Sequence, residues 1–132
     1  MTEDDAKAFL LGMYDRLIGE QPNQQTLDRY ISDDFVAHSD GVTMNRQEFE
    51  GHLALLRKKL RSFDVKIKDV VTSEACIAAI LIVDCFTDAE LGSTIQINAF
   101  YFLRDEKISR LDEISQLIGG SEADRDLVAQ SS

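Results

Sequence analysis

The segment Thr94-Ile-Gln-Ile-Asn-Ala-Phe-Tyr-Phe-Leu103 constrains the fold of this chain more than any other. Alternate residues of a strand point to opposite sides of a sheet, so this pattern predicts a strand that is apolar on both faces. Such a strand has to be covered on both sides. An amide among phenylalanines needs hydrogen-bond partners or a ligand. We therefore expect one face to line a pocket, and its residues are Gln96, Asn98, Phe100 and Phe102.

Other segments predict the elements that surround this strand. Strand-like patterns occur at 64–73, 75–87 and 107–117. Apolar residues at helical spacing occur at 3–19, in a short segment around Leu27 to Ile31, and at 45–61. Asn45, with Glu48 three residues later, resembles a capping box. Helices followed by a meander predict an α+β fold, a cone-shaped barrel with N-terminal helices in the concave face of a curved, mostly antiparallel sheet.

Length and charge narrow the class of protein. The 132 residues fit one domain, expected at 1–118, followed by a polar tail at 119–132. A net charge of -10 disfavours nucleic acid as a partner, because phosphate binding needs clustered Lys and Arg. The acidic start and the lack of a long apolar segment predict a cytoplasmic protein without membrane contact. Two Cys and two His without metal-ligand spacing predict no metal site.

The order of the expected elements resembles the nuclear transport factor 2-like superfamily. Asp33-Asp34-Phe35, His38 and a turn at Gly41 stand between the second and third helices, and the meander follows. The chain is most similar to the SnoaL-like and ketosteroid-isomerase-like branch, over about residues 5 to 118. This superfamily includes enzymes, carriers and scaffolds, so the fold alone does not decide the function.

Ketosteroid isomerases imply a candidate catalytic trio. Tyr14 resembles the tyrosine of their first helix, which donates to an oxyanion. His38 stands where their general-base aspartate precedes a glycine turn, and Asn98 stands where they have a protonated aspartate. A neutral histidine accepts a proton near neutral pH. An asparagine amide can donate to a developing enolate.

SnoaL-like polyketide cyclases imply a further carboxylate. Their last strand resembles Lys107-Ile108 followed by Glu113, but Gln116 stands where their catalytic aspartate is expected. Asp112 or Glu113 could substitute, depending on which of the two the strand pleat turns inward. Asp84 is another candidate for the pocket, since it ends the apolar part of its strand.

These residues also have ordinary structural interpretations. A histidine beside a turn, such as His38, usually bonds a backbone carbonyl. A buried amide such as Asn98 is commonly satisfied by a neighbouring backbone group. Tyr14 lies close to the apolar stripe of the first helix, where core packing would explain it, and we interpret Tyr30 and Tyr101 as packing residues.

Our leading hypothesis is a small, cofactor-free acid–base enzyme of isomerase, cyclase or dehydratase type. His38 would remove a proton next to the carbonyl of a small apolar substrate, while Asn98 and Tyr14 stabilise the enolate. Two alternatives are a non-catalytic binder of a small apolar ligand and a protein-association module whose pocket is filled by its own side chains. The substrate is not encoded in any motif of the sequence.

A second apolar surface predicts self-association. No expected helix remains to cover the other face of the two central strands, and such a patch usually marks an interface. We therefore expect a homodimer that forms sheet to sheet through this outer face. Its residues would be Ile77, Leu81, Val83, Ile95, Ile97 and Leu103.

Overall fold

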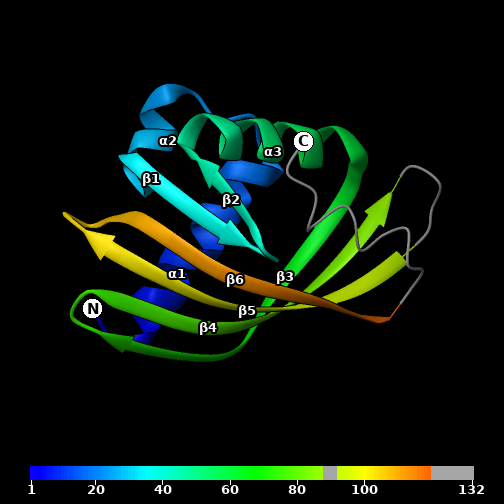
Figure 1. Cartoon of the computed structure of the whole chain (residues 1–132). Helices are drawn as coiled ribbons and strands as arrows, with labels where there is room; N and C mark the ends of the chain where they lie inside the picture. Colours follow the sequence, from blue (N-terminus) through cyan, green and yellow to red (C-terminus); the bar gives the residue numbers. More distant parts are fainter. Residues whose placement is uncertain (88–91, 120–132) are drawn as a thin grey trace.

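A computed structural model describes residues 1–87 and 92–119, and it confirms the predicted α+β fold (Figure 1). Within these residues, three α-helices and one π-helix pack on a curved, six-stranded mixed sheet. The helices are α1 (Glu3–Tyr14), the π-helix η1 (Asp15–Gly19), α2 (Gln24–Tyr30) and α3 (Arg46–Lys59). The strands are β1 (Ile31–Ser39), β2 (Val42–Asn45), β3 (Leu60–Ser73), β4 (Cys76–Thr87), β5 (Gly92–Arg104) and β6 (Lys107–Gly119). Of the tail predicted at 119–132, Gly119 is the last residue of β6, and residues 120–132 lie outside the described residues.

The strand order across the sheet is β2-β1-β6-β5-β4-β3. The four long strands from β3 to β6 form the predicted antiparallel meander. The short strand β1 joins this meander in parallel beside β6, with Ala37 opposite Leu111 and Ser39 opposite Glu113. Figure 1 shows α1 against the inner side of the curved sheet, and α2 and α3 beside β1 and β2. The parallel pair brings the end of β1 next to the middle of β6.

The first helix changes from an α-helix to a π-helix in its last turn. Thr2 caps α1 by accepting from the Asp5 backbone N–H at 3.1 Å, and Ala6, Leu10 and Met13 are buried against the sheet. After Tyr14 the chain continues as a π-helix, which commonly marks a functional site when it occurs within helical structure. The predicted helix at 3–19 is therefore present, but its last turn is wider than an α-turn.

The capping box predicted for the third helix is confirmed. The Asn45 side chain accepts from the Glu48 backbone N–H at 2.9 Å, and the Glu48 carboxylate accepts from the Asn45 backbone N–H at 3.0 Å. The two contacts satisfy backbone donors that the first turn leaves without a partner. Basic residues in the last turn of α3 complement the helix dipole.

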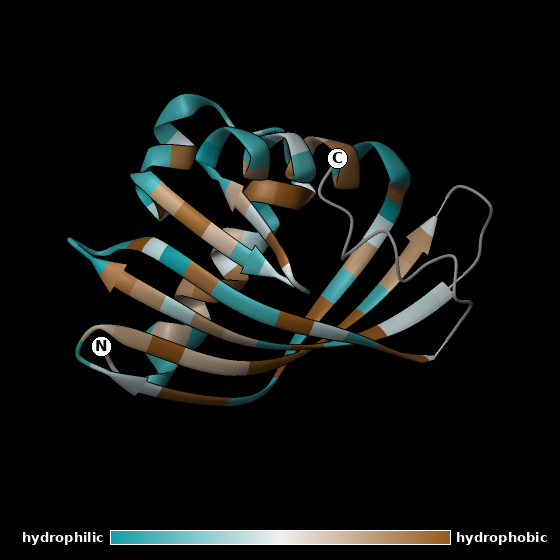
Figure 2. Cartoon of the chain, in the orientation of Figure 1, coloured by the Kyte–Doolittle hydropathy of each residue, from teal (hydrophilic) through white to brown (hydrophobic). Residues whose placement is uncertain are grey.

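The faces of β4 and β5 are the reverse of those predicted. The face with Ile77, Leu81 and Ile95 is buried under the helices, at 1%, 0% and 0% exposure, so it is not an outer surface. The polar face with Asn98 and Phe100 lies outside. Burying that face would leave several amide groups without partners, whereas the aliphatic face carries no such cost. Figure 2 shows β4 coloured as hydrophobic over most of its length, so hydropathy alone does not distinguish its faces.

None of the helices within residues 1–87 and 92–119 has the length and the apolar composition needed to cross a membrane.

Loss of the α3 cap gives a direct test of this local structure. We expect Asn45→Ala to lower the free energy of unfolding by about 1 kcal/mol, because the Glu48 backbone N–H loses its acceptor. Urea denaturation measures the change. Asn45→Ser retains an acceptor and is the control, so an equal loss in both variants would contradict the capping role.

Candidate active site

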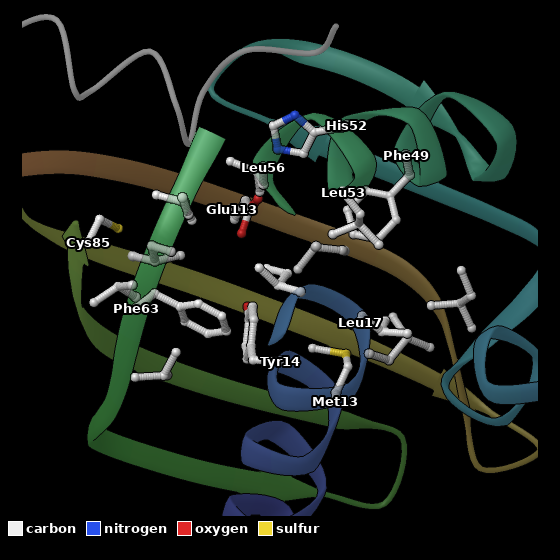
Figure 3. Close-up of a pocket in the computed structure, with 18 of the residues that line it drawn as sticks. Met13, Tyr14, Leu17, Phe49, His52, Leu53, Leu56, Phe63, Cys85 and Glu113 are labelled. Atoms are coloured by element: carbon white, nitrogen blue, oxygen red, sulfur yellow. The ribbon is translucent and has the colours of Figure 1, made fainter. Parts of the chain in front are cut away.

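A cavity of about 70 Å³ lies between α1, η1, α3 and the inner face of the sheet (Figure 3). Most of the side chains that line it are aliphatic or aromatic. The polar groups in its wall are few, and two of them face each other across the cavity region in Figure 3: Tyr14 from the end of α1 and Glu113 from β6. A carboxyl group in such apolar surroundings is costly to ionise.

Glu113 is held by the end of β1. The Ser39 hydroxyl, which is 1% exposed, donates to the Glu113 carboxyl at 2.9 Å. The two residues are paired in the parallel β1–β6 register, so the pleat turns both toward the cavity. The same pleat turns Asp112 to the other side, where it contacts Arg110 at 3.4 Å. Glu113 is thus the inward-facing member of the Asp112–Glu113 pair.

Burial raises the pKa of Glu113 to about 7. The hydrogen bond from Ser39 favours the charged form and opposes this shift, while the nearby charge of Asp40 adds to it. A carboxyl group that titrates near neutral pH can serve as both proton acceptor and proton donor.

The turn after β1 keeps Asp40 close to Glu113. Asp40 has a φ of 48°, in the left-handed region that Asp tolerates better than most residues. Its backbone N–H donates to the Glu113 carbonyl at 3.1 Å, and its carboxylate accepts from the Ser115 backbone N–H at 2.7 Å. These contacts join the β1–β2 turn to β6 at Glu113 and Ser115.

Two tyrosine hydroxyls meet near this carboxyl group. The Tyr14 and Tyr101 hydroxyl oxygens are 2.5 Å apart, and Tyr101 is fully buried. Burial raises the pKa of Tyr14, and the negative charge of Glu113 raises it further. Burial and the neighbouring Tyr14 raise the pKa of Tyr101. Both hydroxyls therefore remain protonated, which leaves Tyr14 able to donate to a ligand while Tyr101 donates to Tyr14.

No protein-family model matches the chain. An uncharacterized protein of Schizosaccharomyces pombe is 24% identical to it over 123 residues, which are 93% of this chain and 95% of that protein. A candidate SnoaL-like polyketide cyclase from Jannaschia sp. CCS1 is 10% identical, with a TM-score of 0.73 over 97% of this chain and 94% of that chain.

Two further solved structures are similar. An LEH-like epoxide hydrolase of Mycobacterium tuberculosis has a TM-score of 0.68 and 16% identity over 86% of this chain and 84% of that chain. A protein with a ketosteroid isomerase-like fold from Catenulispora acidiphila has a TM-score of 0.65 and 14% identity over 80% of this chain and 82% of that chain. This chain has the fold of these SnoaL-like and ketosteroid isomerase-like structures. At these identities, the similarity establishes the fold.

The SnoaL-like fold of this chain does not bring the predicted catalytic trio together. Tyr14 lines the cavity, but His38 is exposed on β1, where its ring nitrogen lies 3.1 Å from the Thr43 hydroxyl. Asn98 is exposed on the outer face of β5, and its side chain accepts from Gln96 at 3.1 Å. The prediction that His38 and Asn98 face the pocket is wrong, because the inner positions of their strands belong to the neighbouring residues.

Four other residues predicted to line the pocket also lie on the outer face: Asp84, Gln96, Phe100 and Phe102. Phe100 and Phe102 stack with their ring centroids 6.2 Å apart, and the Arg110 guanidinium lies 4.0 Å from the Phe102 ring centroid. Asp84 accepts from the Thr94 hydroxyl at 2.7 Å across the β4–β5 pair. These contacts lie on the convex side of the sheet, outside the cavity, so they are structural contacts and do not form part of the pocket.

Three residues of the site were not predicted from the sequence. Tyr101 was interpreted as a packing residue, yet its hydroxyl contacts Tyr14. The sequence signal that could have identified it is a hydroxyl group among the aliphatic residues of one strand face. Ser39 gave no signal, because its partner is far away in sequence. His52 is buried at 4% exposure in the cavity wall on α3, at helical spacing from Phe49 and Leu56.

No group of three or more His, Cys, Asp or Glu residues within 1–87 and 92–119 is arranged to hold a metal ion.

The environment of Glu113 predicts a pH-dependent stability. The folded pKa of about 7 lies above the ordinary value of 4.5, so folding stabilises the neutral form, and this contribution is lost as pH rises from 4.5 through 7. We expect Glu113→Gln to be more stable than the wild type by on the order of 2 kcal/mol at about pH 8. Below about pH 4.5 the difference should vanish.

Urea denaturation at several pH values measures this difference. Glu74→Gln, which removes an exposed carboxylate in the β3–β4 turn, is the matched control and should leave the pH dependence unchanged. Equal pH dependence in the wild type and Glu113→Gln would show that Glu113 is not in an apolar environment.

Proposed function

We propose that this protein is an acid–base enzyme that acts on a small, apolar, carbonyl-containing substrate, by isomerisation, cyclisation or dehydration. Glu113 takes the place that the sequence assigned to His38 as the general base, and Tyr14 stabilises the enolate. The observation that carries the proposal is the buried Glu113 carboxyl group, whose pKa of about 7 suits proton transfer near neutral pH.

The first step is removal of a proton from the carbon next to the carbonyl group. The Glu113 carboxylate accepts this proton, and the electrons of the broken C–H bond form the enolate. The negative charge that develops on the substrate oxygen accepts a hydrogen bond from the Tyr14 hydroxyl. Because Tyr14 is itself hydrogen-bonded to Tyr101 at 2.5 Å, its donor is oriented before the charge appears.

The second step returns the proton from the Glu113 carboxylic acid. Delivery to a different carbon completes an isomerisation, and delivery to a leaving hydroxyl group completes a dehydration. Attack of the enolate carbon on a second carbonyl group of the substrate forms the ring, and the Glu113 acid then protonates the resulting alkoxide to complete a cyclisation. The apolar wall of the cavity favours each route, since it keeps water away from the enolate and strengthens the contact with Tyr14.

The structural neighbours support this class of reaction. Their names describe a candidate polyketide cyclase, an epoxide hydrolase and a ketosteroid isomerase-like fold. Closure of a polyketide ring and opening of an epoxide both depend on proton transfer at oxygen or at carbon. A pocket that served ligand binding alone would gain nothing from an ionisable carboxyl group in an apolar wall.

The two proposed catalytic residues are tested with a cyclic ketone that carries a β,γ double bond. Ultraviolet absorption measures its conversion to the conjugated isomer. We expect Glu113→Gln to lower kcat/KM by about 100-fold or more, because it removes the general base. Tyr14→Phe removes the enolate donor and should lower it by at least about 10-fold. His38→Ala is the control and should retain full activity, because His38 is exposed outside the cavity.

The pH profile of the same reaction is a second readout. Since the base has to be deprotonated, wild-type kcat/KM should rise with pH and level off above about pH 7. Turnover that survives in Glu113→Gln, or that is lost in His38→Ala, contradicts the assignment. Tight binding of the ketone with neither turnover nor exchange of its acidic protons would favour a ligand-binding module instead.

We also propose that a second copy of the chain binds the outer face of the sheet. This is the opposite face from the dimer surface that was expected from the sequence. This face exposes Phe100 at 53% and Ile114 at 69%. Between apolar residues it carries the Gln96–Asn98 amide pair, joined by a 3.1 Å hydrogen bond. Amide groups both donate and accept, so the same pair on a copy related by a two-fold axis is complementary to it.

Light scattering tests this dimer. We expect a mass of twice 14.8 kDa for the wild type and a shift toward the monomer for Phe100→Lys, which places a charge in the interface. A wild-type mass near 14.8 kDa would contradict the dimer.

A further inference from the structure

A second hollow, of about 580 Å³, adjoins the Glu113 cavity. It lies between the end of α1, the π-helix, the last turns of α3 and the start of β3. Its wall shares five residues with the wall of the cavity, so the two spaces lie next to each other. These five are Tyr14, Ile18, Leu60, Phe63 and Val65. The cavity alone is small for an organic substrate, so part of a ligand that reaches Glu113 must lie in the second hollow.

Arg57 is the partly buried charge of this hollow. Its guanidinium donates to the Leu17 carbonyl at 2.6 Å, and no carboxylate in the described part of the chain forms an ion pair with it. Partial burial lowers the pKa of Arg57. A guanidinium has five N–H donors, so most of them are available to a ligand.

Four other charged residues line the hollow. They are Asp15, Glu20, Arg61 and Asp64, and all four are exposed to solvent. Water and salt screen exposed charges much more than partly buried ones. In a chain with a net charge of -10, a partly buried arginine without a carboxylate partner beside the cavity calls for a specific explanation.

We infer that the substrate carries an anionic group, a carboxylate or a similar oxyanion, which binds Arg57 in the second hollow while the carbonyl end reaches Glu113. This inference rests on the proposed function, because it names the class of substrate for the same site. The ligand is then a keto acid with an apolar middle section, which passes Phe63 and Tyr14 between the two spaces. Arginine suits such a group because its planar donors match the geometry of an oxyanion.

Levulinate and its longer homologues, with added methylene groups between ketone and carboxylate, are the probes for this site. Their methyl esters differ only in lacking the charge. Ligand-observed NMR measures the dissociation constant of each pair without requiring turnover. At one chain length, we expect the wild type to bind the acid about 10-fold more tightly than the ester. A difference of this size is expected from one charge-assisted contact.

Two substitutions of Arg57 and one control substitution, all on α3, assign this contrast to Arg57. Arg57→Gln leaves a shorter, polar side chain and removes the charge, so it should abolish the preference for the acid and leave ester binding unchanged. Arg57→Lys keeps the charge and should retain part of the preference. Lys58→Gln removes an exposed positive charge that lines neither space, and it should change neither constant.

The outcomes separate this inference from the proposed function. Equal binding of acid and ester at every chain length overturns the anion site, whatever the activity of Glu113. If Arg57→Gln and Lys58→Gln weaken binding of the acid equally, the anion site is also overturned, because the effect would then be one of overall charge. A preference for the acid that depends on Arg57 supports the site even if the ketone isomerisation assay shows no turnover.

Discussion

Parallel pairing of β1 with β6 is the contact on which the site depends. It places Ser39 beside Glu113 and brings the turn at Asp40 against the β6 backbone. The cost of placing a carboxyl group in an apolar cavity is reduced by one strong hydrogen bond rather than by a cation, so the group is held in position without being fixed in its charged form. An arginine in place of Ser39 would lower the pKa of Glu113 and remove its capacity to take up and release a proton near neutral pH.

The sequence was sufficient for the architecture, since the periodicity of the helices, the Asn45–Glu48 capping box and the apolar strands all depend on local pattern. It was not sufficient for the strand faces. Both faces of β5 are apolar apart from two amides, and the face that is buried depends on which side the helices cover. The Gln96 amide donates to the Asn98 side chain at 3.1 Å, and because the pair lies on the outer surface, water can reach the remaining amide groups, so they need no ligand.

The same limit explains what could be predicted of the site. Tyr14 was found through the resemblance to ketosteroid isomerases, whereas the choice between Asp112 and Glu113 stayed open until the pleat of β6 placed Glu113 in the cavity wall. His38 was misassigned because a residue one position away, Ser39, holds the inward place on β1. A shift of one residue exchanges the faces of a strand. Tyr101 and Ser39 act through partners distant in sequence, and only the tertiary structure brings these pairs together.

The π-helix at Asp15–Gly19 links the two ends of the site mechanically. Tyr14 directly precedes this turn, and the Leu17 carbonyl within it is the group that Arg57 binds. An anion that draws the guanidinium away from Leu17 acts on the same short stretch of backbone that carries the Tyr14 hydroxyl. The Tyr14 hydroxyl and the proposed anion site are thus attached to points of the main chain only three residues apart.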